Sequence, residues 1–314
     1  MGQDRQLFIL TFSEKDRLVG IAPFYIRRRK VGFFCFRELL FLGTPEAGSD
    51  FLDVLTRKGR EKEISNTLYE YLHGEGRSCW DQLHLSDIRA DSLFLHHFMN
   101  RFKEEGRYAE LTRSAYCPVA QLPDTEGELY PMLSPGWRKK VKQDVRVSNR
   151  DYEVSHAVFG NSDIEGQLES FFELYEEKGG WAGEQVHLIL KKLLSKYAGD
   201  MPFQLDFLFL DDQPLAALFH FKYKETISMY LMAVDKNFNP KISIGNLLVG
   251  YCIKNAISTG FKYYDFLKGD ELYKFHWSNN GHSTLQLNVW QKRPVAYCLA
   301  LVRLARYAGK LLLR

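Results

Sequence analysis

Two segments of the chain repeat one pattern of apolar strand, polar turn and apolar strand. In the first segment, apolar residues 7–12 precede the turn 13–16 and a second β-prone run, 18–26. In the second, residues 205–210 precede the turn 211–213 and the run 215–223. Asp16 and Asp212 occupy the same place in the two turns, at an offset of 212 minus 16, or 196. Each pattern predicts a β-hairpin.

A second match lies near the end of each half of the chain. Residues 80–85 and 264–267 are strand-like, and each run follows a Gly-containing stretch after a predicted helix. Strand and turn patterns also recur in any α/β protein, but two matches in the same order favour two copies of one unit.

Four segments carry apolar residues at the spacing of an amphipathic helix. Their apolar faces are Ile64, Leu68, Tyr71 and Leu72; Leu168, Phe171, Phe172 and Tyr175; Val186, Leu190, Leu193, Leu194 and Tyr197; and Ile244, Leu247, Leu248, Tyr251 and Cys252. Helices mixed with hairpins predict an α/β or α+β fold. Residues 123–136, rich in Pro, Gly and acidic side chains, are the expected connection between the halves.

The composition is that of a globular protein without a strong charge bias. Of 314 residues, 45% are hydrophobic and 26% are charged, and the formal net charge is +3. The overall charge therefore does not call for a nucleic-acid partner. The five cysteines have neither metal-ligand nor redox spacing, and no segment has the length and apolarity of a transmembrane helix. We expect a cytoplasmic protein with reduced thiols.

The clearest candidate for a ligand site is the start of the helix that begins near residue 244. An apolar strand, 227–234, leads through a loop to Lys241, Ser243 and Gly245. Free backbone N–H groups at a helix N-terminus suit a phosphate or pyrophosphate. Gly245 would allow a ligand to approach the backbone, and Ser243 could cap the helix. An ordinarily capped helix after a loop is the alternative.

The next strand gives this helix a chemical context. Polar and aromatic residues crowd the segment YYDFLKGDELYKFHW, residues 263–277. This segment, with SIGNLL upstream, resembles the GNAT-fold acetyltransferase family of bacterial cellulose and envelope polysaccharide biosynthesis proteins. It is also similar to the Fem-type aminoacyltransferases, whose Phe-Lys-x-x-Phe element has the spacing of residues 273–277. The family's Ser-Pro-Gly is replaced here by Ser243-Ile244-Gly245.

The resemblance implies a fold of tandem acetyltransferase (GNAT)-like units, with mixed sheets flanked by helices. We expect a shortened N-terminal unit over residues 1–133 and an acyltransferase unit over residues 134–314. The implied activity is transfer of an acyl group from acetyl-CoA or another acyl-CoA to an amine or hydroxyl of a polar metabolite or sugar. No metal is implied.

By the same resemblance, each part of the site is assigned to particular residues. The strand 231–234, with Met232 and Val234, would face the pantetheine arm. The pyrophosphate would be held by Lys241, Ser243, Ile244, Gly245 and Asn246.

Acyl transfer needs a base, a donor to the oxyanion and a proton for the leaving thiolate. Lys274 would stabilise the oxyanion or hold an acidic acceptor, and Tyr273 would protonate the thiolate. Asp265 or Asp270 would orient the amine or act as the base. A turn role for Asp265 and a surface salt bridge for Lys274 are the alternatives.

Other residues are candidates for binding the acceptor or an anionic partner. Trp181 and Trp277 would border the acceptor cleft, although Trp181 could equally anchor a loop to the core. Ser134 and Pro135 begin a predicted helix whose basic stripe would bind an anion or simply be solvated. The stripe consists of Arg138, Lys142, Arg146 and Arg150.

A second basic stripe follows Pro294. It comprises Arg303, Arg306, Lys310 and Arg314 and would rest on a membrane surface or face water.

Two other functions compete with acyl-CoA chemistry. A Fem-like aminoacyltransferase would use charged tRNA, which the first basic stripe supports, although we find no long inserted helical hairpin. A non-catalytic module binding a glycan or protein is the other. The nine histidines show no metal-binding motif, and a Gly-x-Ser-x-Gly hydrolase motif is absent.

Overall fold

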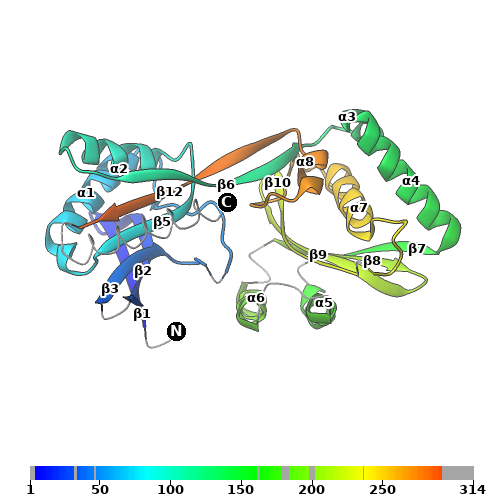
Figure 1. Ribbon diagram of the computed structural model, residues 1–314, viewed down its shortest axis with the longest axis horizontal. Coiled ribbons are helices and arrows are strands. Elements are labelled where there is room, and N and C mark those ends of the chain that lie inside the picture. The colour runs from blue at the N-terminus through cyan, green and yellow to red at the C-terminus, as the bar shows by residue number, and fades with distance from the viewer. Residues whose placement is uncertain are drawn as a thin grey trace, which may run out of the picture. The chain divides into compact units, whose positions relative to one another are not determined.

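The computed structural model describes residues 4–31, 34–45, 47–160, 163–177, 184–197, 202–235 and 237–291 (Figure 1). Contacts within the chain define unit 1, from Met1–Ala115 and Ser283–Arg314, and unit 2, Tyr116–His282. This division differs from the boundary expected between residues 133 and 134. The reason is strand pairing: residues 119–121, from the first half, pair with unit 2, and residues 284–290, from the second half, pair with unit 1.

Unit 1 is a mixed sheet with helices against it. Its strands follow the order β1 (Arg5–Glu14), β2 (Arg17–Val31), β3 (Phe34–Phe41), β5 (Gln82–Arg89) and β12 (Asn280–Trp290), and β4 (Leu55–Thr56) pairs with β2. The helical segments are α1 (Glu61–His73), η1 (Glu75–Ser78) and α2 (Leu93–Glu104). Buried side chains of α1 and α2 pack with Phe24, Phe41 and Leu85 of the sheet in one hydrophobic core.

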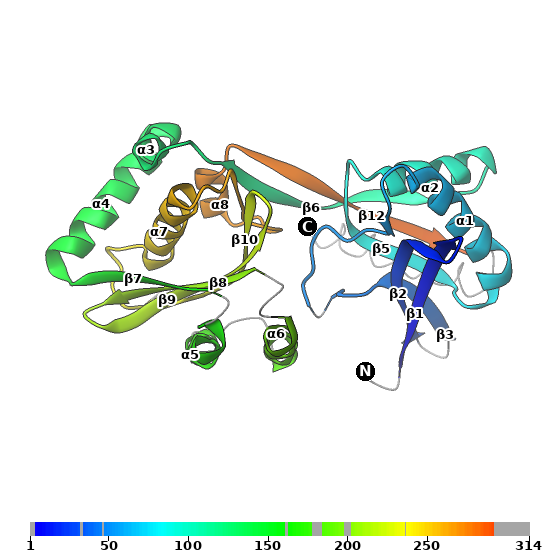
Figure 2. The same cartoon turned by 180° about the vertical axis from the view of Figure 1, so that it is seen from behind.

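Unit 2 is a sheet with helices on both faces (Figure 2). Its strands follow the order β6 (Glu110–Gln121), β11 (Tyr263–Asp265), β10 (Thr226–Val234), β9 (Gln213–Tyr223), β8 (Phe203–Leu210) and β7 (Val154–Phe159). One face packs on α5 (Ile164–Glu177) and α6 (Glu184–Tyr197). The other packs on α4 (Pro135–Asp151), α7 (Ile244–Ser258) and α8 (Leu272–Trp277), near η2 (Glu126–Glu128) and α3 (Leu129–Met132).

The two units repeat one order of elements. In each, three antiparallel strands lead to a helix and to a strand parallel to the third, β3 with β5 and β10 with β11. Both predicted hairpin turns have two consecutive residues with positive φ, Lys15–Asp16 and Asp211–Asp212, as in a type I′ turn. Both hairpins also shift register at equivalent positions, after Phe12 and after Leu208, which are 208 minus 12, or 196, residues apart. The tandem fold is therefore confirmed.

Local sequence signals explain the helices. All four predicted helices are present, and Leu68, Phe171, Leu190 and Leu248 on their apolar faces are fully or almost fully buried. Pro135 begins α4, and the hydroxyl of Ser134 accepts a hydrogen bond from the backbone N–H of Trp137. Among the described residues, no helix is long and apolar enough to cross a bilayer.

Candidate functional site

The predicted ligand site lies where β10 leads into α7 (Figure 1). The pairing of β10 with β11 joins Thr226 to Tyr263 and Ser228 to Asp265, and β11 ends there. β10 continues to Val234 and carries a β-bulge between Met229 and Leu231. Bulges bend a strand and increase its twist. Within the described part of the chain, the β11 side of residues 231–234 has no strand partner.

The first turn of α7 has open backbone amides. The first helical hydrogen bond runs from the N–H of Leu247 to the carbonyl of Ser243. Among described residues, the N–H groups of Ile244, Gly245 and Asn246 make no hydrogen bond. Ser243 occupies the N-cap position, but it does not cap the helix as expected. Its hydroxyl accepts a hydrogen bond of 2.7 Å from the side-chain amide of Asn246 instead.

The loop between β10 and α7 is held in place by its own side chains and by the end of α4. The carboxylate of Asp235 accepts from the N–H of Asn237 at 2.9 Å, and Oδ1 of Asn239 accepts from the N–H of Lys241 at 2.9 Å. The amide of Asn239 donates to the hydroxyl of Tyr152 at 3.0 Å. The backbone of Lys241 is thus fixed, while its side chain is exposed.

Gly245 packs against β10. A Cβ atom built on Gly245 would lie 3.3 Å from Cγ2 of Val234 and 3.7 Å from Cε of Met232. The structure therefore gives Gly245 a role other than ligand approach, because the space beside it is filled by the protein itself. Met232 and Val234 are half-buried and pack against the α7 core.

Asp265 ends β11 and forms a turn. The side chain is buried, and Oδ1 accepts a hydrogen bond of 2.8 Å from the N–H of Leu267. Leu267 has a φ of 53°, in the left-handed region, so the chain turns sharply after β11. These contacts match the turn role that the sequence offered as the alternative for Asp265.

Lys274 is buried, and its ammonium forms a salt bridge with the exposed carboxylate of Glu271. Only 4% of the residue is exposed, and Nζ donates to the carbonyl of Lys268 at 2.8 Å. Nζ also lies 3.0 Å from Oε2 of Glu271. An ammonium group has three N–H donors, so these two contacts leave one for another acceptor. The ammonium is fixed by the loop between β11 and α8.

The other two candidate catalytic residues differ in environment. Burial, and then the charge of Glu271, raises the pKa of Tyr273 far above its usual value, so the phenol stays protonated at neutral pH. The shift also makes Tyr273 a weaker acid. Asp270 is exposed.

Trp277 was expected at the acceptor cleft, but it belongs to the core of unit 2. It is 4% exposed, and Cη2 would lie 3.4 Å from a Cβ atom on Gly250 of α7. Its ring meets that of Trp137 edge-on, with centroids 6.0 Å apart. The indole fills the space between helices and does not offer a surface to a substrate.

Two cations of the basic stripe on α4, Arg138 and Lys142, make contacts within the protein. Arg138 donates to the carbonyls of Pro131 and Leu133 at 2.7 and 3.1 Å, and thus anchors the end of α3. Lys142 is exposed and lies 5.5 Å from the ring centroid of Tyr130. Trp181 and the basic stripe after Pro294 lie outside the described residues.

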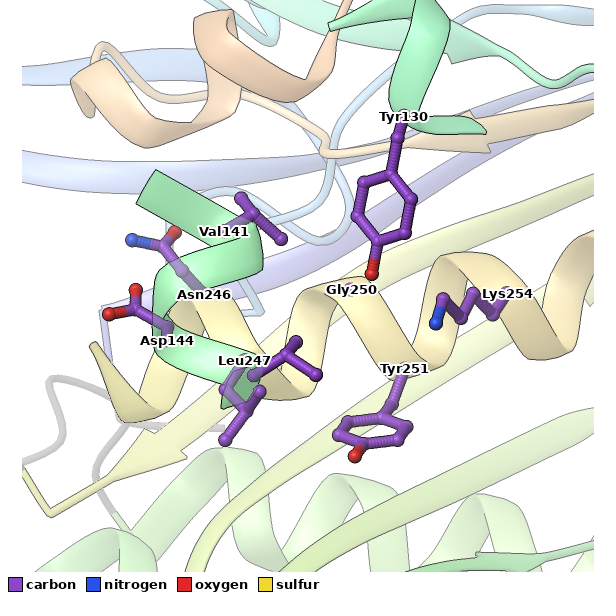
Figure 3. Close-up of a pocket in the computed structure, with 9 residues that line it drawn as sticks. Tyr130, Val141, Asp144, Asn246, Leu247, Gly250, Tyr251 and Lys254 are labelled. Atoms are coloured by element: carbon purple, nitrogen blue, oxygen red, sulfur yellow. The ribbon is translucent and has the colours of Figure 1, made fainter. Parts of the chain in front are cut away.

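A small pocket lies between α4 and α7, and Figure 3 shows its lining. Tyr130 forms one wall, and Lys254 lies 5.2 Å from its ring centroid. Asn246, from the first turn of α7, and Tyr251 also line it. The pocket thus reaches the first turn of α7, but it includes none of the predicted catalytic residues.

Sequence reasoning missed a buried polar cluster on the α7 face of the sheet. It consists of His156, Gln204, Asp206, His220, Cys252 and Tyr264. A signal was present, because Asp206 and His220 each stand directly between apolar residues of a strand, in Leu-Asp-Phe and Phe-His-Phe. Buried polar residues of this kind need partners.

Comparisons with known proteins agree with this architecture. Residues 137–275 match the acetyltransferase (GNAT) domain family. A comparison with curated protein sequences finds no match.

Several solved structures share the fold over almost the whole chain. FemX is 10% identical, with a TM-score of 0.58, and the match covers 94% of this chain and 90% of FemX. L-PGS from Bacillus licheniformis is 12% identical, with a TM-score of 0.54, covering 98% of this chain and 90% of that chain. A tandem GNAT protein from the clavulanic acid biosynthesis pathway is 9% identical, with a TM-score of 0.50, covering 91% of this chain and 84% of that chain. The chain thus has a tandem GNAT fold, and its residues 137–275 match an acetyltransferase domain.

Proposed function

We propose that unit 2 transfers an acyl group from acyl-CoA, with acetyl-CoA as the expected donor, to an amine or hydroxyl of a polar acceptor. The observation that carries this proposal is the first turn of α7, whose backbone N–H groups are open. This turn follows β10, which continues past the end of its pairing with β11. The match of residues 137–275 to the acetyltransferase (GNAT) domain family supports it.

The α7 start suits the pyrophosphate of CoA. Open N–H groups at Ile244, Gly245 and Asn246, together with the positive end of the helix dipole, favour an anion there. The hydroxyl of Ser243 and the exposed side chain of Lys241 would add a donor and a charge. Since the loop is already held through Tyr152, little ordering entropy would be lost on binding.

The pantetheine arm would lie along residues 231–234 of β10. No strand among the described residues pairs with the β11 side of this segment, so its backbone groups there would bind the arm by hydrogen bonds of the strand type. The half-buried side chains of Met232 and Val234 would provide an apolar wall.

In the reaction, the acceptor nitrogen or oxygen bonds to the thioester carbonyl carbon, and the carbon–sulfur bond breaks. The acceptor loses one proton, and the thiolate of CoA gains one. The remaining N–H donor of Lys274 would stabilise the oxyanion. Tyr273 stays protonated and would give its proton to the thiolate, while the exposed carboxylate of Asp270 would accept the proton of the acceptor.

The acceptor is expected to be a small polar metabolite or a sugar, within an envelope or polysaccharide pathway of a bacterial cytoplasm. Lys142 and Arg146 are exposed on α4 and would attract an anionic acceptor. Asp265, Arg138 and Trp277 would support the site from the protein side, through the contacts described above.

A second candidate donor is an aminoacyl-tRNA. The likeness to FemX and the exposed cations of α4 favour it. Transfer from an aminoacyl ester would use the same oxyanion donor, but binding would depend on contacts with phosphates.

Calorimetric titration with acetyl-CoA tests the proposal. Lys241→Glu reverses the charge at the α7 start without entering the contact between Gly245 and Val234, and should weaken binding at least about tenfold, or 1.4 kcal/mol. Lys103→Glu, which reverses an exposed charge on α2 of unit 1, is the matched control. The proposal fails if the wild-type protein does not bind CoA, or if both variants bind equally well.

A salt series distinguishes the two donors. If tRNA is the donor, its affinity should fall steeply with salt, and removing the charges of Lys142 and Arg146 should reduce the slope by about one for each phosphate contact. Tight acetyl-CoA binding with only weak, non-specific tRNA binding would exclude the second candidate.

A further inference from the structure

Asp206 is the centre of a buried cluster in unit 2. Its Oδ1 lies 2.9 Å from Nε2 of His156. Its Oδ2 accepts from the side-chain amide of Gln204 at 2.9 Å and lies 3.0 Å from Nδ1 of His220. The thiol of Cys252 also interacts with this carboxylate. We call these residues the Asp206 cluster.

The members of the Asp206 cluster come from separate elements and are held rigidly. His156 lies on β7, Asp206 on β8, His220 on β9 and Cys252 on α7. Asp206, His220 and Cys252 are completely buried, and the side chain of His156 is 13% exposed. Adjacent strands and a packed helix thus fix the donor atoms from opposite directions.

The cluster gathers several polar side chains inside the core of unit 2. The carboxylate of Asp206 has contacts with His156, Gln204 and His220. Polar and charged groups are found in a protein core where they have such partners.

We propose that Nε2 of His156, Oδ1 of Asp206 and Sγ of Cys252 form a binding site for a Zn²⁺-like transition-metal ion. One ligand atom from each of the three residues lies within 4.8 Å of the other two, and Nε2 of His156 is 2.9 Å from Oδ1 of Asp206. In a tetrahedral zinc site with bonds of about 2.0–2.3 Å, ligand atoms are roughly 3.3–3.6 Å apart. On binding, side chains that are farther apart than this, up to 4.8 Å, would move closer to the ion.

The donor set selects the type of ion. Imidazole nitrogen, carboxylate oxygen and thiolate sulfur are ligands of Zn²⁺ and its neighbours, whereas Mg²⁺ and Ca²⁺ prefer oxygen alone. Binding would release the thiol proton of Cys252 to solvent, and the proton of His156 would reside on Nδ1. The positive charge of the bound Zn²⁺ would balance the negative charges of the Asp206 carboxylate and the Cys252 thiolate.

Supporting residues around the ligands are also present. The second oxygen of Asp206 is held by Gln204 and His220, and Nε2 of His220 lies 2.7 Å from the hydroxyl of Tyr264. Such outer contacts orient ligands in metal sites. Because the side chain of His156 is partly exposed, an ion would enter from this side, and a water molecule would complete the tetrahedral shell. This site is independent of the proposed acyl transfer.

Cobalt substitution tests the proposal on the whole chain. The protein is stripped with a chelator and titrated with Co²⁺, whose thiolate charge-transfer absorption reports a cobalt–sulfur bond. We expect one Co²⁺ per chain with this absorption, displaced by Zn²⁺. Cys252→Ser should abolish the absorption and His156→Gln should weaken binding at least about tenfold. Cys117→Ser, which removes another fully buried cysteine of unit 2, should change neither the absorption nor the affinity for Co²⁺.

The supporting residues provide a further variant, and X-ray absorption provides a test without mutation. His220→Gln should weaken Zn²⁺ binding by about 10–100-fold, as expected of an outer contact. In the Zn²⁺-loaded wild-type protein we expect one sulfur at about 2.3 Å and nitrogen or oxygen at about 2.0–2.2 Å. The proposal would be overturned by a Zn²⁺ coordination shell without sulfur, or by thiolate absorption of Co²⁺ that persists in Cys252→Ser. The Asp206 cluster would then be a hydrogen-bonded network of the core.

Discussion

Gly245 lies directly against Val234: a Cβ atom on Gly245 would be 3.3 Å from Cγ2 of Val234. This contact brings the first turn of α7 onto β10, where the proposed CoA site lies. A side chain at residue 245 would require the side chain of Val234 to move by a few tenths of an ångström. The glycine therefore sets the distance between the open amides and the apolar wall formed by Met232 and Val234.

Replacing Gly245 by alanine should destabilise the protein. We expect the free energy of unfolding to fall by about 1 kcal/mol, because the added methyl group overpacks the contact with Val234. Val234→Ala in the same chain should relieve part of this loss, since the two residues are in contact. Unfolding in urea measures each variant and the double mutant.

Gly166→Ala is the matched control, because Gly166 also lies in the first turn of a helix but a Cβ atom added to it would have no atom within 4 Å. There, alanine should stabilise the protein by up to about 1 kcal/mol through its higher helix propensity. Equal stabilisation by both substitutions would contradict the packing role of Gly245.

The burial of Trp277 predicts a large loss of stability on truncation. Trp277→Ala should lower the free energy of unfolding by about 3–5 kcal/mol, because it removes a core indole packed on Gly250 and Trp137. Phe275→Ala, on the same short helix, should cost less, because Phe275 is 43% exposed. If both variants unfold at the same urea concentration as the wild type, Trp277 is not a core residue.

Local features of this fold were readable from the sequence. The hairpin at Asp16 and that at Asp212 have the same turn and the same register shift because turn chemistry acts over a few residues. Ser134 and Pro135 begin α4 for the same reason. The apolar spacing of α7 likewise identified its buried face.

Long-range features were not readable. The pairing of residues 284–290 with β5 depends on which strand edges are open in three dimensions, and no pattern in residues 280–290 records it. The Asp206 cluster joins residues separated by up to about a hundred positions, so no motif spacing reveals it. Lys274 lies in a mixed polar and aromatic segment, and its spacing does not show that the carbonyl of Lys268 and the carboxylate of Glu271 surround its ammonium.

The shared turn of the two hairpins makes a prediction about backbone strain. Asp16 has a φ of 63°, which glycine adopts without the cost that a Cβ imposes. Asp16→Gly should therefore raise the free energy of unfolding by about 0.5–1 kcal/mol. Ser13→Gly, two residues before the turn and within β1, should lower it by a similar amount because glycine weakens a strand. A loss of stability in Asp16→Gly would show that the aspartate side chain, not the backbone, determines this turn.

The raised pKa of Asp53 predicts how the free energy of unfolding depends on pH. Burial, and to a smaller extent the charge of Asp91, raises the pKa of Asp53, although hydrogen bonds from Ser92 and from the N–H of Val54 oppose the shift. A carboxyl whose pKa is raised by folding favours the folded state when it is protonated. Its contribution is fully present below the unfolded pKa of about 3.9 and is lost as the pH rises through the folded pKa.

Asp53→Asn keeps an oxygen acceptor for the N–H of Val54, which lies 2.8 Å from Oδ1, but it cannot ionise. The variant should therefore be more stable than the wild type at pH 7, and the difference should shrink as the pH falls towards about 4. Asp124→Asn is the opposite control, because a hydrogen bond from Lys262, followed by its charge, lowers the pKa of Asp124. Urea unfolding between pH 4 and pH 7 measures both, and a difference for Asp53→Asn that grows towards low pH would contradict the sign derived from its burial.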